Sequence, residues 1–271
     1  MQTSTIQIEN VHRRFPDGTV ALEGVNLSVQ PGEFVSLVGP SGCGKSTLLR
    51  ILAGLDTATS GVARLNGRSP SDPQARQEMA FVFQEPTLMP WKSVLNNVAL
   101  PLELRGVGVR ERQDRARQSL ELVGLSGREG AYPRELSGGM KMRVSIARAL
   151  VTKPQVMLMD EPFGALDEMT RQRLNDELLG IQQQTGATVV FVTHNMFEAV
   201  YLSRRIVVMT PHPGRVAAVL EVPEAYPRDG SFRASELYGR LVYQVLQILE
   251  GRPALPAERL PAYSPVASVP A

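Results

Sequence analysis

The feature that most constrains this chain is a glycine-rich loop at residues 39–47, which lies between an apolar segment and a helical one. Residues 33–38 before the loop predict a buried β-strand, and residues 47–53 after it, closed by Gly54, predict an α-helix. A strand, a glycine turn and a helix N-terminus aim several backbone N–H groups and the positive end of the helix dipole at one point. The loop therefore indicates a polyphosphate site rather than a chance glycine-rich turn.

The loop fits the pattern G-x-x-x-x-G-K-[ST], in which two side chains have distinct chemistry. Lys45 can reach the β and γ phosphates, and the Ser46 hydroxyl can take a position on Mg²⁺. Cys43 lies beside the helix N-terminus and two residues from Lys45, so we expect a reactive thiol that a bound nucleotide would cover. The residues of this loop that we predict to bind the nucleotide are Gly39, Ser41, Gly42, Cys43, Gly44, Lys45, Ser46 and Thr47.

A second apolar segment, residues 156–159, ends in two acids. A central parallel strand delivers such carboxylates to the C-terminal edge of its sheet, although two acids can also be mere surface charge. In the first case Asp160 can hold Mg²⁺, through water, and Glu161 can orient or deprotonate a water that attacks the γ-phosphate.

A third motif, residues 136–143, lies between these two and predicts another helix N-terminus. Ser137 fits an N-cap, and Gly138 and Gly139 allow a ligand to approach the backbone closely. The helix would continue to Leu150, and its N-terminus suits a second contact with phosphate.

With this motif the chain resembles the ATP-binding cassette (ABC) transporter ATPases, whose signature LSGGQ precedes the acidic strand. Met140 departs from the pattern, because glutamine is usual there. The resemblance implies that Ser137 and Gly139 contact the γ-phosphate, so the departure weakens the assignment little. It spans about residues 4 to 222 and implies ATP and Mg²⁺ as cofactors.

The other family elements follow in order. By resemblance, Phe15 stacks on adenine, Gln84 links Mg²⁺ and water to the transporter contact, and His194 holds the γ-phosphate. Residues 164–167 resemble the loop that crosses to the partner subunit. Phe15 can instead be a core residue, since an aromatic side chain beside a strand usually packs. Of the other histidines, His12 and His212 receive no role.

The geometry predicts a dimer, because one subunit lacks a second anion clamp over the γ-phosphate. The helix that begins at Ser137 is too far along the chain to close on its own site, so it should close on a partner's. Two head-to-tail copies related by a two-fold axis would enclose two ATP molecules, and ATP would favour the closed dimer.

Residues 83–91, 160–167 and 205–215 are similar to importer ATPases of the nitrate, sulfonate, taurine and pyrimidine-precursor group. The resemblance implies uptake of a small solute through separate membrane permease subunits, with a periplasmic or extracellular solute-binding protein as an indirect partner. Leu88, Met89 and Trp91 form an apolar cluster at a proline-marked loop. They can seat a helix of a membrane partner or pack within the helical subdomain.

Composition agrees with a cytosolic enzyme, and the resemblance implies that it acts at the cytoplasmic face of the membrane. The formal net charge of +2 gives no support to nucleic-acid binding, and a single cysteine excludes an internal disulfide framework. We expect no signal peptide and no membrane span, since no stretch of about 18 apolar residues exists. A GTPase would need an N-K-x-D motif, which is absent. A DNA-repair ATPase would separate the motifs by a long coiled coil, and a translation-associated protein would carry two cassettes. A module without turnover is disfavoured by Glu161 and His194.

The predicted fold is α/β: a P-loop NTPase with a parallel-sheet core, an N-terminal antiparallel β layer and an inserted α-helical subdomain. Residues 1–35 would form the antiparallel layer, residues 36–84 would begin the parallel sheet, and residues 88–150 would be helical. Residues 151–222 would return to alternating strand and helix, before a last helix over residues 231–250. We predict one ATPase domain over residues 1–250 and a proline-rich tail over residues 251–271.

Overall fold

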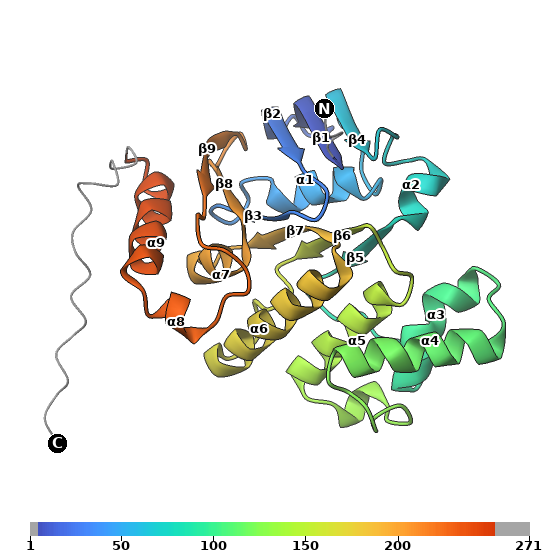
Figure 1. The fold of residues 1–271 in the computed structure, drawn as a ribbon. Helices are drawn as coiled ribbons and strands as arrows, with labels where there is room; N and C mark the ends of the chain where they lie inside the picture. Colours follow the sequence, from blue (N-terminus) through green and yellow to red (C-terminus); the bar gives the residue numbers. More distant parts are fainter. Residues whose placement is uncertain (1–4, 253–271) are drawn as a thin grey trace, which may run out of the picture.

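A computed structural model describes residues 5–252 of the chain, so the predicted tail lies outside the described residues save for its first two. The strands are β1 (Ile6–Arg14), β2 (Val20–Val29), β3 (Phe34–Val38), β4 (Ser60–Leu65), β5 (Met79–Val82), β6 (Val156–Asp160), β7 (Thr188–Thr193), β8 (Arg205–Met209) and β9 (Val216–Glu221). The α-helices are α1 (Lys45–Leu52), α2 (Pro73–Gln77), α3 (Val94–Leu104), α4 (Val109–Leu122), α5 (Gly138–Leu150), α6 (Glu168–Thr185), α7 (Met196–Leu202), α8 (Gly230–Arg233) and α9 (Glu236–Leu249) (Figure 1).

The central sheet has the strand order β5-β6-β7-β3-β8-β9. In this sheet β5, β6, β7, β3 and β8 pair in parallel with their neighbours, and β9 pairs antiparallel with β8. Because parallel strands present their carboxyl ends at one edge, the loop after β3, Asp160 at the end of β6 and His194 after β7 meet at that edge. The predicted parallel core is confirmed, and the β8–β9 hairpin adds one antiparallel strand, β9, at its edge.

The second sheet is antiparallel and has the order β2-β1-β4. It confirms the predicted N-terminal layer but is larger than expected. Residues 36–84 do not all join the parallel sheet, because β4 pairs with β1, with Ile6 opposite Leu65. Strand β4 exposes most of its residues, which suits a solvated antiparallel edge and not a parallel strand buried on both faces.

Helices α3, α4 and α5 gather at one side of the parallel sheet, and α8 and α9 lie at the other (Figure 1). Ser93 and Ser137 cap α3 and α5 through their side chains, as their residue type favours. The single helix expected over residues 231–250 is two helices, because Ser235 caps a new helix, α9, after the short α8.

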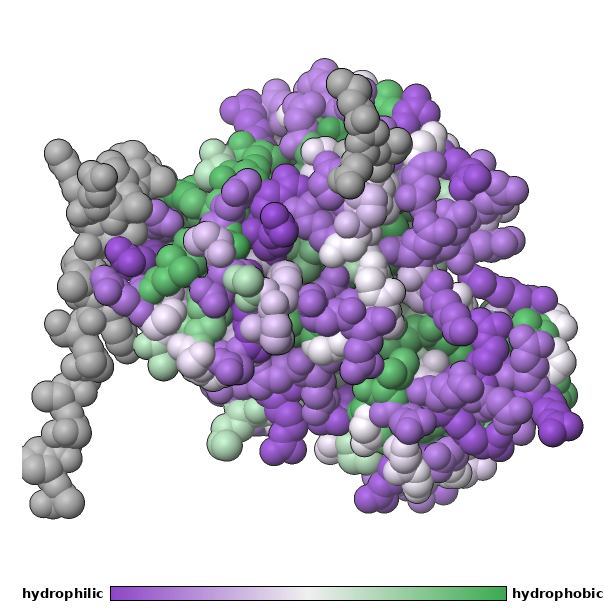
Figure 2. Space-filling model, viewed as in Figure 1, coloured by the Kyte–Doolittle hydropathy of each residue, from purple (hydrophilic) through white to green (hydrophobic). Residues whose placement is uncertain are grey.

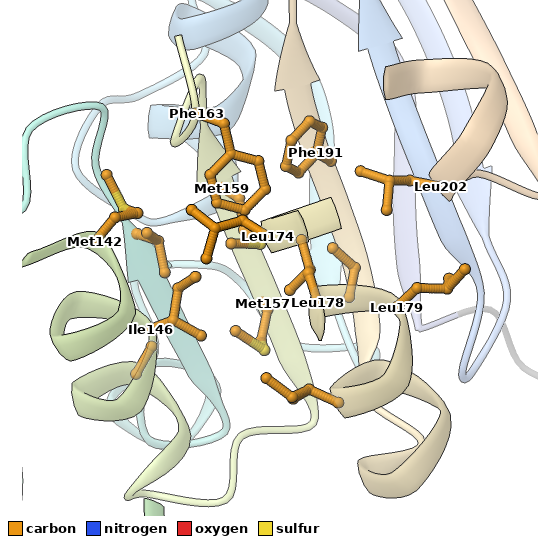
Figure 3. Packing of buried hydrophobic residues seen from close by; sticks show 14 of the residues in the cluster. Met142, Ile146, Met157, Met159, Phe163, Leu174, Leu178, Leu179, Phe191 and Leu202 are labelled. Atoms are coloured by element: carbon orange, nitrogen blue, oxygen red, sulfur yellow. The ribbon is translucent and has the colours of Figure 1, made fainter. Parts of the chain in front are cut away.

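Two hydrophobic clusters pack on the two faces of the parallel sheet, and successive side chains of β3 alternate between them. Phe34 belongs to the cluster formed with the helices, and Val35 to the one formed with α1 and the antiparallel sheet. In Figure 3, Phe163 and Phe191 lie side by side above Leu174, with ring centroids 5.9 Å apart. Since Phe163 is two residues beyond Glu161, this packing fixes the segment that carries Glu161.

On the face shown in Figure 2, hydrophilic residues dominate and hydrophobic ones form separate patches. Within residues 5–252, no helix combines the length and the apolar character that crossing a bilayer requires.

Candidate active site

The loop between β3 and α1 is shaped by glycines at positions where a side chain would collide. A Cβ on Gly44, whose φ is +91°, would lie 2.7 Å from the carbonyl oxygen of Ala21, and one on Gly39 would lie 2.6 Å from Cys43 Sγ. Lys45 is buried, and its Nζ donates to the carbonyls of Gly39 at 2.8 Å and Pro40 at 3.0 Å. The loop thus folds around Lys45, and its carbonyls hold the ammonium group of this residue close to the first turn of α1.

Ser46 and Asp160 come from different elements and meet at the carboxyl edge of the sheet. The Ser46 hydroxyl donates to Asp160 Oδ1 at 2.8 Å. Burial raises the pKa of the Asp160 carboxyl, and the hydrogen bond from Ser46 opposes that shift. A hydroxyl and a partly buried carboxylate at this distance form an all-oxygen donor set of the kind that Mg²⁺ prefers.

Glu161 and His194 form the second pair of the site. His194 Nδ1 lies 2.9 Å from Glu161 Oε2. A carboxylate can only accept, so in the neutral ring Nδ1 carries the proton and Nε2 remains an acceptor. Glu161 has a φ of +44°, and its backbone N–H donates to Val192 O at 2.9 Å. Such a backbone angle is costly for a residue with a side chain and is typical of functional positions.

Arg171, near the start of α6, joins the segment after Glu161 to the segment after β7. Its guanidinium donates to the carbonyl of Leu166 at 2.7 Å and to Glu168, and its Nε lies 3.7 Å from Glu198 Oε1. Glu198 is only 4% exposed, and Thr193 Oγ1 donates to its Oε2 at 2.6 Å. Burial raises the pKa of the Glu198 carboxyl, while Thr193 and Arg171 lower it. Arg171 and Glu198 therefore link the loop that carries Glu161 to the segment that follows His194.

A cavity of about 430 Å³ opens at this edge. Its lining residues are Phe15, Thr19, Val20, Ala21, Ser41, Gly42, Gly44, Lys45, Ser46, Thr47, Gln84, Glu161 and His212. The cavity brings Phe15, from the antiparallel layer, together with Lys45 and Glu161 from the parallel sheet. Arg13 lies over the Phe15 ring, with its guanidinium carbon 4.7 Å from the ring centroid.

Several predicted residues are not in the cavity wall. Asp160 and His194 adjoin it through their bonds to Ser46 and Glu161. The residues that line the cavity within the described chain do not include Ser137, Gly138 or Gly139. Ser137 instead caps α5 by accepting from the N–H of Met140 at 3.3 Å.

The packing of α5 accounts for two features of its sequence, the glycine at position 139 and the methionine at position 140. A Cβ on Gly139 would lie 2.9 Å from Thr170 Cγ2, so α5 approaches α6 closely there. Met140 is partly buried against the hydrophobic cluster on the helical side of the sheet, where an apolar side chain fits better than an amide.

The predicted reactivity of Cys43 is wrong, because its side chain is completely buried. Its thiol faces the cluster beneath the loop, and Lys45 Nζ lies 3.8 Å from Sγ. The backbone of Cys43 remains part of the loop.

His212, which belongs to none of the predicted motifs, lines the cavity. It belongs to the β8–β9 hairpin, whose position depends on pairing with distant segments. The only sequence signal was its place in a proline- and glycine-rich turn that ends a strand of the same sheet as the phosphate loop.

The apolar cluster at residues 88–91 is divided by the fold. Leu88 packs against the hydrophobic cluster of the helical side, while Trp91 is 71% exposed. Of the two alternatives left open for Trp91, packing within the helical subdomain is therefore wrong.

Comparison with known proteins places this site in a family. The family model described as ABC transporter matches residues 22–164. The chain belongs to the ABC transporter ATPases. It is 48% identical to the aliphatic sulfonates import ATP-binding protein SsuB of Bacillus subtilis, over 77% of this chain and 80% of that protein. It is 45% identical to the taurine import ATP-binding protein TauB of Rhizobium johnstonii, over 84% and 88%.

A solved dimer of the ATP-binding cassette MJ0796 in a post-hydrolysis state, bound to ADP and Pi, has the same fold as this ABC ATPase. The TM-score is 0.72 at 34% identity, over 81% of this chain and all of that one. The comparisons confirm the predicted family, the α/β fold and ATPase activity. They also confirm the resemblance to sulfonate and taurine importer ATPases.

Proposed function

We propose that this chain is the ATP-hydrolysing subunit of an ABC importer and works as a head-to-tail dimer. The observation that carries the proposal is an incomplete site: one cavity gathers Lys45, Ser46, Gln84 and Glu161, while the capped N-terminus of α5 lies elsewhere. A single chain thus offers one half of an anion clamp at each of two places. Pairing two copies head to tail would complete both sites.

In this proposal the loop N–H groups and Lys45 bind the phosphates, and Phe15 stacks on the adenine. Glu161 accepts a proton from the attacking water or orients it. By resemblance His194 would contact the γ-phosphate, and because its Nδ1 is bonded to Glu161, Nε2 is the ring nitrogen left for that contact. Ser137, Gly138 and Gly139 would contact the γ-phosphate bound to the other copy.

Mg²⁺ fits the same site, since the Ser46 hydroxyl, the Asp160 carboxylate and the Gln84 amide oxygen are all hard oxygen ligands. These three residues would hold it, with Asp160 acting through water. When bound, the ion would neutralise charge on the β and γ phosphates.

The transported solute is assigned by class. The relatives named above are importers of aliphatic sulfonates and of taurine, so we infer nitrate, a sulfonate, taurine or a related small molecule. The exposed Trp91 would meet a helix of the permease. The chain would then act as a peripheral subunit at the cytoplasmic face, with a solute-binding protein as an indirect partner. Residues 1–250 would form the ATPase domain, with residues 88–150 as its helical subdomain.

The dimer is tested by mixing two inactive variants. Ser137→Arg should abolish hydrolysis and spare ATP binding, and Lys45→Ala should abolish binding. A one-to-one mixture should regain up to about a quarter of wild-type turnover, because half of the dimers then hold one intact site of two. Ser126→Arg, at another exposed serine of the same segment, is the control and should remain active. Loss of ATP binding in Ser137→Arg would show that the serine serves its own chain.

A further inference from the structure

We propose that His212 is a nucleotide-contacting residue that donates a hydrogen bond to the phosphate chain from the side of Gly42. The inference rests on the proposed placement of ATP in the cavity and adds a contact from the β8–β9 hairpin, which neither the sequence motifs nor the family comparison assigns.

The hairpin is held against the nucleotide cavity by backbone hydrogen bonds to β2. Gly214 N–H donates to the Ala21 carbonyl at 3.1 Å, and Glu23 N–H donates to the Gly214 carbonyl at 3.0 Å. Arg215 Nε donates to Glu23 Oε2 at 3.0 Å. These contacts fix the hairpin where β2 meets the phosphate loop.

The hairpin also touches the phosphate loop itself. A Cβ on Gly214 would lie 2.2 Å from the carbonyl oxygen of Cys43, so no residue with a side chain fits there without moving one of the two backbones. A Cβ on Gly42 would lie 3.8 Å from His212 Cε1. The imidazole therefore rests directly beside the loop that would wrap the phosphates.

His212 has features of a binding residue more than of a packing one. It is exposed within the cavity, and its φ of +39° is unfavourable for a residue with a side chain. Within residues 5–252, no hydrogen bond or ion pair engages its ring. His212 thus combines an unfavourable backbone angle with an unpaired polar ring that faces a cavity. This combination is expected of a residue that contacts a ligand.

The chemistry of the ring suits a phosphate oxygen. In either neutral tautomer one ring nitrogen donates, and both do when the ring is protonated. A hydrogen bond between this donor and a charged oxygen contributes roughly ten- to hundredfold in affinity. Ser41, Gly42 and Lys45 line the same cavity as His212, so the ring and the phosphate loop would contact the same phosphates.

The test compares His212→Ala and His212→Arg in the full-length protein by isothermal titration with the non-hydrolysable analogue AMP-PNP, ADP and AMP. His212→Ala should weaken AMP-PNP binding about tenfold and AMP binding less, and His212→Arg should retain near wild-type affinity because it keeps a donor. His12→Ala is the matched control: His12 contacts Asn10 and lies outside the cavity wall, so affinity should not change.

Two results would overturn the inference: unchanged AMP-PNP affinity in His212→Ala, or a loss that His212→Arg does not restore. An equal loss for all three nucleotides would also overturn a contact with the β or γ phosphate, because the ring would then contact a part that all three share, the nucleoside or the α-phosphate. Lys45→Ala separates the two proposals. If Lys45→Ala binds AMP-PNP normally, the proposed ATP site is wrong; if Lys45→Ala does not bind while His212→Ala binds with wild-type affinity, only the role of His212 is wrong.

Discussion

Replacing Arg171 with methionine should destabilise the protein in a pH-dependent way. The substitution keeps much of the side-chain volume but removes the hydrogen bonds to the carbonyls of Leu166 and Phe163 and the cation 3.7 Å from Glu198. The contact with Glu168 is exposed on the glutamate side and should contribute little. Glu198 Oε1 is buried without a hydrogen bond, so Arg171 is the charge that compensates it.

Two terms give the size of the effect. The lost hydrogen bonds from this charged donor should together cost about 1.5 kcal/mol, because Arg171 is 19% exposed and its bond to Phe163 O is long at 3.4 Å. Leaving a buried carboxylate unpaired costs about 3–5 kcal/mol, which we reduce to about 2 kcal/mol because Thr193 still donates to Glu198. The free energy of unfolding should therefore fall by about 3–4 kcal/mol at alkaline pH.

The pH dependence follows from the raised pKa of Glu198. A carboxyl whose folded pKa exceeds its ordinary value of 4.5 holds its proton longer in the folded state, so stability falls as pH rises between the two values. Loss of Arg171 raises that pKa further and widens the window. At a pH low enough to protonate Glu198 in the folded state, the loss should shrink to about 1.5 kcal/mol, the part that comes from the hydrogen bonds.

Urea denaturation of the wild type, Arg171→Met, Glu198→Gln and the double variant at about pH 5 and about pH 8 measures these terms. Arg171→Met combined with Glu198→Gln should recover about 2 kcal/mol at the higher pH, because no charge is then buried. Arg173→Met, at an exposed arginine of the same helix, is the control. The reasoning fails if the two substitutions are additive within about 0.5 kcal/mol at both pH values.

Three further predictions concern the site. Glu161→Gln should bind ATP, run as an ATP-dependent dimer in light scattering, and lose about 10²–10⁴-fold in turnover if Glu161 is the general base; retention of half the turnover would exclude that role. GTP should be hydrolysed measurably but less well than ATP, because stacking on Phe15 contributes about 1–3 kcal/mol for any base; strict rejection of GTP in a phosphate-release assay would mean that another residue reads the base edge. A maleimide should label Cys43 slowly in the folded protein and completely in urea, since the thiol is buried; rapid labelling of the folded protein would contradict the packing of the loop.

The sequence predicted those parts of the site whose signals are local. The phosphate loop, Asp160, Glu161 and His194 each end or follow a strand of the parallel sheet, and parallel strands bring such positions to one edge whatever their order in the sheet. The caps at Ser93 and Ser137 were likewise readable from residue type.

The parts that were missed depend on contacts between distant segments. The burial of Cys43 follows from packing under the loop, and the place of His212 follows from pairing of its hairpin with β2. The ion pair between Arg171 and Glu198 joins positions 27 residues apart on different helices. No periodicity or motif within one segment encodes such contacts.

The exposed Trp91 has a practical consequence, because it is the only tryptophan of the chain. Indole emission shifts to shorter wavelength when the ring leaves water, and tyrosine emission is separable from it. The unmodified protein thus carries a single indole fluorophore, and it lies on the surface proposed to meet the permease. Docking onto membrane subunits in detergent or nanodiscs can be followed by the wavelength of maximum indole emission, without attaching a dye to the chain.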